Sequence, residues 1–376
     1  MSAPTLPYAA IPGKRRSLGK ITSYILLILS LYAFLVSIGM LSKAFKLMGG
    51  GFVDGLLASA TNPVIGLFVG ILATTLVQSS SSTTSLVVAM VGGGTMSVAT
   101  AIPVIMGANI GTSVTNTLVS LGHMRRGREF RRAFAASTVH DFFNIFSVLV
   151  LFPLQIATNF LGGLSSSLAS LLERAGGLTF TSPLKTVTAP AVSLAVSLLG
   201  SHPVVLLIAS AAILFLALHR LVVVLKALVV SKAESLFDQV IFRNPGRAMA
   251  FGLLLTVLVQ SSSITTSLVV PLAGAGLLSL RQIFPYTLGA NVGTTVTAIL
   301  ASLAVGEVNA VTVAFAHLLF NVCGILLVWP LPVIRRIPMR AARGLARLAI
   351  RSRLVPLLYI LIGFYLGPLL VILLLR

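Results

Sequence analysis

Long apolar runs occupy most of the chain, and their lengths predict membrane-spanning helices. The runs at 21–41, 203–226 and 354–375 reach the roughly 20 residues that an α-helix needs to cross a bilayer. They lack the strict alternation of apolar and polar positions that membrane β-strands require. The pattern therefore predicts an all-α polytopic membrane protein.

The chain also contains an internal repeat. Residues 76–88 (LVQSSSSTTSLVV) match residues 258–270 (LVQSSSITTSLVV) at twelve of thirteen positions. At the same offset of 182, Gly107–Thr115 (GANIGTSVT) matches Gly289–Thr297 (GANVGTTVT). Chance does not produce two such matches at one offset, so the sequence predicts two copies of one folding unit.

Each copy contains apolar runs that are too short to cross a membrane. The runs on either side of each serine block are about fifteen and ten residues long, against the roughly 20 residues of a full span. This predicts a re-entrant helical hairpin with its tip near the middle of the membrane. The Gly/Asn interruptions at 107–115 and 289–297 likewise predict a broken transmembrane helix in each repeat. Interrupted segments at matching positions in two halves are typical of a transporter site.

Composition excludes several classes of protein. Hydrophobic residues make up 57% of the chain and charged residues 9%, which is too few charges for a water-soluble surface. The serine blocks lack a Gly-x-Ser-x-Gly elbow, and the five histidines lack metal-ligand spacing. We therefore expect no enzymatic activity, no cofactor and no resident metal.

Charge distribution predicts how the repeats are oriented. The chain has 27 basic and 7 acidic residues, and the basic ones cluster in loops, which indicates topology signals and lipid contacts rather than nucleic-acid binding. The exit loop of the first repeat is rich in arginine around Arg128, whereas the matching loop of the second carries Glu307. Arg281 in the second repeat corresponds to Ala99 in the first. The two repeats are therefore expected to have inverted topologies.

These observations predict a division of the chain into six parts. We expect a cytoplasmic basic N-terminus (1–20), repeat 1 (21–154), an external linker (155–200), inverted repeat 2 (201–333), a basic cytoplasmic segment (334–353) and a final span (354–376). Each repeat begins with an ordinary span, and amphipathic stretches follow at 44–58 and 227–242. The expected location is the inner cell membrane.

The serine blocks are the main candidate for chemistry. Eight consecutive polar residues, Gln78–Ser85 and again Gln260–Ser267, need partners inside hydrocarbon. The N-terminus of a returning half-helix carries unpaired N–H groups and suits an oxyanion, while carbonyl, Gln and Thr oxygens suit a small hard cation such as sodium. The alternative is close helix packing through small residues, which would place them at every fourth position rather than in a row.

Polar residues at the two interruptions complete the candidate set. Freed carbonyls there could join an ion-binding shell, or Asn and Gly could merely permit the break. The residues concerned are Asn109, Thr112 and Thr115 in the first repeat, and Asn291, Thr294 and Thr297 in the second. Nearby, Asp141 is expected to cap its helix or to pair with Arg128, Arg131 or Arg132, and His317 to be a core histidine.

The paired blocks resemble the type II sodium–phosphate cotransporters, the animal carriers of solute carrier family 34 and their bacterial relatives. The similarity extends to FRRAFAASTVHDFFN (130–144) and AHLLFNVCGILLVWP (316–330). It implies sodium-coupled symport of inorganic phosphate between two serine tips. Carried over, the phosphate-binding residues would be Gln78, Ser79, Ser80, Ser81, Gln260, Ser261, Ser262 and Ser263. The sodium-binding residues would be Thr83, Asn109, Thr112, Thr115, Thr265, Asn291, Thr294 and Thr297.

Other functions on the same frame stay open at this point. The chain could carry another small anion, such as sulfate, arsenate or a carboxylate, or it could form an anion channel. Alternating access by an elevator-like movement is expected by analogy with other two-hairpin carriers. The expected partners are phosphate, sodium ions and the lipid bilayer, and a homodimer is also open.

Overall fold

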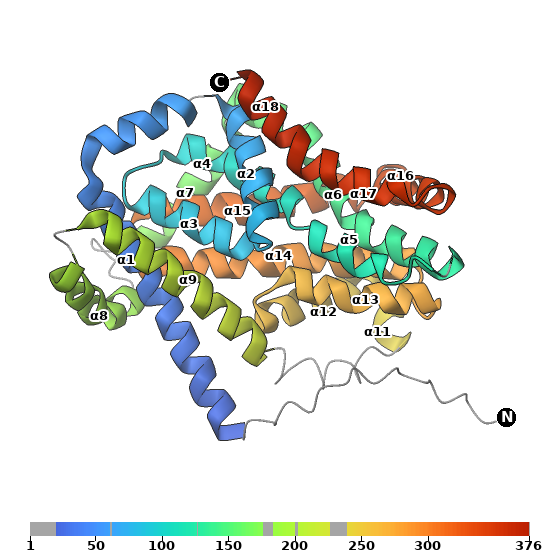
Figure 1. Cartoon of the computed structure of the whole chain (residues 1–376), viewed down its shortest axis with the longest axis horizontal. Coiled ribbons are helices and arrows are strands. Elements are labelled where there is room, and N and C mark those ends of the chain that lie inside the picture. Colours follow the sequence, from blue (N-terminus) through green and yellow to red (C-terminus); the bar gives the residue numbers. More distant parts are fainter. Residues whose placement is uncertain are drawn as a thin grey trace.

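The computed structural model describes residues 20–60, 62–125, 127–175, 183–199, 202–225 and 239–375. Within these ranges every regular element is helical (Figure 1). The predicted N-terminal segment, up to residue 19, and most of the amphipathic stretch predicted at 227–242 lie outside the described residues. The all-α fold class predicted from the apolar runs is confirmed.

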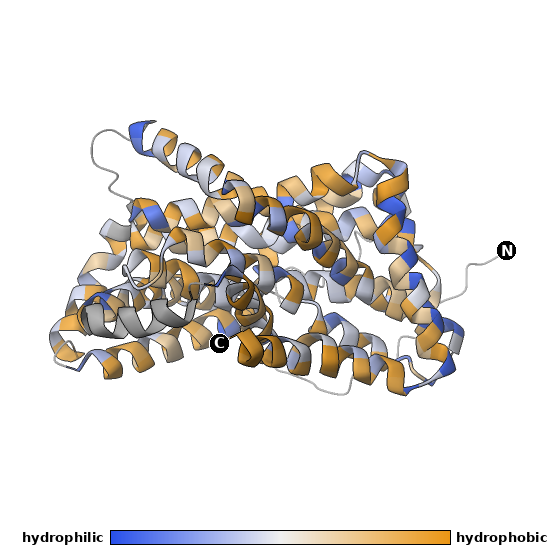
Figure 2. Cartoon of the chain, turned by 90° about the horizontal axis from the view of Figure 1, so that it is seen from above, coloured by the Kyte–Doolittle hydropathy of each residue, from blue (hydrophilic) through white to orange (hydrophobic). Residues whose placement is uncertain are grey.

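Seven helices in the described part of the chain are long and apolar enough to cross a membrane. They are Ile21–Leu47, Val98–Leu121, Gly127–Thr158, Pro203–Val224, Leu280–Val305, Val308–Val328 and Leu354–Leu375. Figure 2 shows hydrophobic residues, coloured orange, along most of the helices. Large apolar side chains among them face outward, including Ile28 at 67% exposure and Leu374 at 81%. Hydrocarbon favours such a surface and water does not, so the chain is a multi-pass membrane protein.

Two long helices pack side by side at one edge of the molecule. They are α1 (Lys20–Ala60) and α9 (Pro203–Leu225), and they share an apolar cluster that includes Phe34, Ile38 and Leu218. The span and the amphipathic stretch predicted separately at 21–41 and 44–58 belong to the single element α1. Figure 1 shows this helix changing direction before α2 begins.

Two helical hairpins follow these long helices. The first consists of α2 (Pro63–Val77) and α3 (Ser80–Gly92), and the second of α12 (Pro245–Val259) and α13 (Ser262–Ala275). Asn62 and Asn244 cap the entering helices through their side chains, and each is followed by a proline in the first turn. None of these four helices reaches the length of a full span, as the short apolar runs predicted.

The predicted break is present in the first repeat and absent from the second. Helix α4 (Val98–Gly111) ends at Gly111, and Thr112 and Ser113 separate it from α5 (Val114–Leu121). In contrast, α14 (Leu280–Val305) runs without interruption through the matching Asn and Gly positions. The prediction of a broken helix in repeat 2 is therefore wrong.

The glycines of this motif serve close helix packing. A Cβ atom on Gly107 would meet the backbone oxygen of Leu67 in α2, and one on Gly289 would meet that of Met249 in α12. The next glycine of α14, Gly293, also lies close to α12, since its Cβ would lie 2.7 Å from Leu253 O. The entering helices α2 and α12 thus contact α4 and α14 backbone to backbone. This contact explains why α14 has glycines although it does not break.

The remaining helices surround the hairpins. They are α6 (Gly127–Thr158), α7 (Phe160–Ala175), α8 (Pro183–Leu199), α11 (Gln239–Arg243), α15 (Val308–Val328), α16 (Pro332–Arg351), α17 (Leu354–Ile360), the π-helical segment η2 (Leu361–Leu366) and α18 (Gly367–Leu375). Helix α6 contacts both α13 and α16, and α15 contacts α3, α7 and α14. Helices of the two repeats are therefore interleaved rather than separated into two halves.

Candidate functional site

The two hairpin tips have the same local geometry. We call Gln78–Ser81 the first tip and Gln260–Ser263 the second tip. Gln78 and Gln260 end the entering helices in the left-handed region, with φ of 57° and 55°. Ser79 and Ser261 then cap the returning helices by accepting hydrogen bonds from Ser82 N and Ile264 N. The duplicated sequence therefore folds into duplicated turns.

The glutamine side chains join each tip to a neighbouring helix. Thr115 Oγ1 donates to Gln78 Oε1 at 2.8 Å, and Thr297 Oγ1 donates to Gln260 Oε1 at the same distance. The amide nitrogens of both glutamines bond to carbonyls in the last turns of α2 and α12. These hydrogen bonds attach the first tip to α5 and the second tip to α14.

Several hydroxyl groups at the tips are free to bind a ligand. Ser80, Ser81 and Ser262 are at most 6% exposed, and their hydroxyls bond to no other group among the described residues. Helices α3 and α13 begin at Ser80 and Ser262, so their first backbone N–H groups have no acceptor within the helix. Each tip thus presents hydroxyl and amide donors to the same space, which is the chemistry that binds an oxyanion.

The break between α4 and α5 connects the two tips. Ser263 Oγ in the second tip donates to Thr112 O at 3.5 Å, and Thr115, one turn further, bonds to the first tip. The structure therefore brings the two predicted tips and the first predicted interruption into one polar cluster.

Asn116 in α5 is a contributor that sequence reasoning missed. Its Nδ2 donates to Thr266 Oγ1 at 2.6 Å, and its Oδ1 accepts from Ser267 Oγ at 2.9 Å, so it ties α5 to the returning helix of the second hairpin. At the repeat offset of 182 its counterpart is Ala298, which packs in an apolar cluster. A search for polar residues that occur in both repeats does not find Asn116, because the second repeat has alanine at the matching position.

Thr74 and Thr256 were also missed, although the repeat relates them. Both lie in the last turn of an entering helix, both are fully buried, and neither hydroxyl has a hydrogen-bond partner among the described residues. An unpartnered hydroxyl in a dry interior is costly, so these oxygens suit a bound cation. Their recurrence at the offset of 182 was the signal that could have identified them.

The predicted sodium-binding threonines bond mainly to their own helices. Thr83 and Thr265 donate to the backbone oxygens of the capping serines, and Thr112 and Thr294 donate to Ala108 O and Ala290 O. A hydroxyl that donates its proton keeps oxygen lone pairs, so each can still serve as a ligand.

Asn109 and Asn291 lie in a different cluster, which crosses between the repeats. Asn291 bonds to His140 and donates from Nδ2 to Asn144 Oδ1 at 2.9 Å. At the equivalent place, Asn109 Oδ1 lies 3.4 Å from both His317 Nε2 and Asn321 Nδ2. Each repeat's Asn therefore meets the His and Asn of the other repeat in a fully buried network. The side chains of these two predicted ligands are used in holding the repeats together.

Asp141 forms a contact that differs from the expected one. Tyr359 in α17 donates to its Oδ2 at 2.8 Å, so the carboxylate anchors the last apolar helix. Both expected roles are wrong: Asp141 lies in the middle of α6 rather than at its start, and no ion pair among the described residues includes it. Arg132 instead donates from Nε to Gly274 O at the end of the second hairpin. Asp141 is fully buried within α6.

Fixed charge is missing from the tips. Neither tip contains a charged residue, and the two ion pairs found in the described ranges, Lys46–Glu307 and His123–Glu129, involve no tip residue. Likewise, the described residues include no cluster of His, Cys, Asp and Glu that could hold a metal ion. The tip residues themselves therefore offer an anion only dipoles and hydroxyls.

Comparison with known proteins identifies the family. A family model described as Na+/Pi-cotransporter matches residues 33–173 and 213–328, which include both hairpins. The chain belongs to the Na+/Pi-cotransporter family. This result confirms the resemblance drawn from the paired serine blocks, and it agrees with the expectation that the chain is a transporter and not an enzyme.

Two named relatives illustrate the similarity. The sodium-dependent phosphate transport protein 2A of Rattus norvegicus is 36% identical over 91% of this chain and 66% of its own length. The sodium-dependent phosphate transport protein 2B of Homo sapiens is 33% identical over 97% of this chain and 68% of its own length. The chain thus spans about two thirds of the length of these relatives. None of the solved protein structures matches it significantly.

Proposed function

We propose that this Na+/Pi-cotransporter family member is a secondary active transporter that carries inorganic phosphate into the cell together with sodium. The observation that supports this most directly is the pair of equivalent tips, each with a helix N-terminus and free serine hydroxyls, linked through the α4–α5 break. In this proposal phosphate binds between Ser79–Ser81 and Ser261–Ser263, and Gln78 and Gln260 support the turns.

Sodium coupling follows from the charge balance of this site. A divalent phosphate would be buried without any basic side chain at the tips. A helix N-terminus contributes about 0.3–2 kcal/mol toward binding an anion, whereas burying an ion costs several kcal/mol. Bound sodium ions would supply the missing positive charge, with threonine hydroxyls and tip carbonyls as ligands. Thr83, Thr112, Thr115 and their repeat counterparts stay candidate ligands, and we add Thr74 and Thr256.

The transport movement belongs to the same proposal. The hairpins and the helices packed on them would move as a core against α1 and α9, giving alternating access to the tips. We further propose that the repeats are inverted in the membrane, that the N-terminus is cytoplasmic and that the protein resides in the inner cell membrane. The ion pair between Lys46 Nζ and Glu307 Oε1, 2.8 Å apart, then lies on the external side of the membrane, where Glu307 is expected.

Uptake of radiolabelled phosphate into proteoliposomes tests this function. With an inward sodium gradient we expect uptake to be saturable and about tenfold or more faster than with potassium or choline, because sodium and phosphate stabilise each other in the site. An excess of unlabelled sulfate should leave this uptake unchanged. Equal uptake with all three cations would contradict sodium coupling. If unlabelled phosphate inside the vesicles does not drive counterflow of labelled phosphate, the protein would be a channel rather than a carrier.

A further inference from the structure

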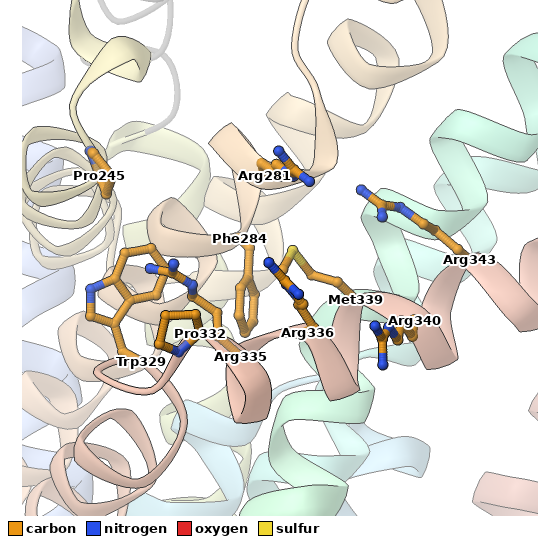
Figure 3. Close-up of a pocket in the computed structure, with 10 residues that line it drawn as sticks. All are labelled: Pro245, Arg281, Phe284, Trp329, Pro332, Arg335, Arg336, Met339, Arg340 and Arg343. Atoms are coloured by element: carbon orange, nitrogen blue, oxygen red, sulfur yellow. The ribbon is translucent and has the colours of Figure 1, made fainter.

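A second basic site lies away from the serine tips. A pocket of about 600 Å³ is lined by Pro245, Arg281, Phe284, Trp329, Pro332, Arg335, Arg336, Met339, Arg340 and Arg343. It is formed where α12 and α14 begin and where α16 passes them. Figure 3 shows the guanidinium groups of Arg281, Arg336 and Arg343 directed toward one shared space.

The charge in this pocket is not balanced by the described residues. Its ten lining residues include five arginines and no acidic residue. Neither of the ion pairs found in the described part of the chain involves these arginines. Arg335 is instead stacked on Trp329, with its Cζ atom 4.6 Å from the ring centroid. Five like charges repel one another at this range, so an anion is the natural occupant. The planar guanidinium matches the oxygens of a phosphate group better than any other side chain.

Helix α16 divides into three faces, and they indicate what carries the phosphate. Pro338, Met339, Ala342, Ala346 and Ala349 face the protein and are buried. A second face carries Arg336, Arg340, Arg343, Arg347 and Arg351. A third face, next to the arginines, exposes Val333, Ile337 and Leu348 at 72%, 42% and 51%. A helix with adjacent basic and exposed apolar faces lies in the membrane interface, with its charges among the headgroups.

We propose that this pocket binds the phosphate headgroup of an anionic phospholipid, with the acyl chains along the exposed apolar face of α16. Free phosphate shares the phosphate chemistry, but it would leave most of a 600 Å³ pocket unfilled and has no use for the apolar walls of Phe284, Trp329 and Met339. A bound headgroup would bridge α16 to the starts of α12 and α14. The lipid would therefore connect a peripheral helix to the hairpin that carries the second tip.

Native mass spectrometry of the purified full chain in detergent tests this site. Phosphatidylglycerol, phosphatidylcholine and inorganic phosphate are titrated separately, and the bound population is measured for each. The test variant carries Arg336→Gln, Arg340→Gln and Arg343→Gln. The matched control carries Arg347→Gln, Arg351→Gln and Arg353→Gln, which removes the same charge from the same region outside the pocket. A single Arg281→Gln variant changes the pocket from α14 and tests it without altering α16.

We expect phosphatidylglycerol to bind the wild-type chain and the control alike, and to bind the test variant about 100-fold more weakly, because each interfacial arginine contributes about 1 kcal/mol. Arg281→Gln should weaken binding about fivefold. Phosphatidylcholine should bind weakly throughout. Equal losses in test and control variants would mean a diffuse charge effect and would overturn the proposal. Saturation by inorganic phosphate as tightly as by phosphatidylglycerol would show free phosphate to be the occupant and would also overturn it. Each readout is independent of transport.

Discussion

Replacing both Ser80 and Ser262 with alanine should weaken phosphate binding at least about 100-fold. Each change removes a free hydroxyl at the start of a returning helix, and a hydrogen bond to a charged ligand contributes about 1.5–3 kcal/mol. The protein should still fold, because the two hydroxyls bond to no other group among the residues described. Isothermal titration of phosphate into purified protein in sodium buffer measures the effect.

The control for this experiment is a pair of serines buried elsewhere. Ser210 and Ser302 are fully buried, and each donates to a carbonyl of its own helix. Changing both to alanine removes the same atoms from the interior and should leave phosphate affinity unchanged. If the tip variant binds phosphate as well as this control does, the tips are not the phosphate site.

Gly107→Ala and Gly289→Ala should each destabilise the fold by about 3 kcal/mol. The added methyl group would meet a backbone oxygen of the facing helix, and neither backbone can move without separating the hairpin from its partner. The change is measured by thermal unfolding in detergent, with the loss of monodisperse protein as the readout. Gly344→Ala in α16 is the control, since nothing lies within 4 Å of its added Cβ, and it should be neutral or slightly stabilising. Equal stability of all three variants would exclude backbone contact as the role of these glycines.

The hairpins could be predicted because their signals are local. Asn-Pro at the start of each entering helix, Gln-Ser at each turn and the short apolar runs act through neighbouring residues, and the structure contains them at both repeats. The interruption could not be predicted in the same way. Nearly identical motifs give a break after Gly111 and a continuous helix through Gly293, so the surroundings decide. One difference is Asn116, which bonds to the other hairpin where the second repeat has Ala298.

The central network shows a second limit of sequence reasoning. His140 and His317 were recognisable as repeated residues, yet their partners Asn291 and Asn109 lie in the opposite repeat. Nothing local to a histidine indicates which distant helix will face it. For Asn109 and Asn291 the repeated motif predicts a place in the ion site, and the structure adds hydrogen bonds from their side chains to helices of the other repeat.

The central claim is that phosphate binds at the two tips with its charge balanced by sodium. Isothermal titration of phosphate into wild-type protein, once in sodium and once in choline at equal ionic strength, tests it most directly. We expect sodium to raise phosphate affinity about tenfold or more, and phosphate to raise sodium affinity by the same factor, as linkage requires. Phosphate binding that is equally tight in both buffers would contradict the account.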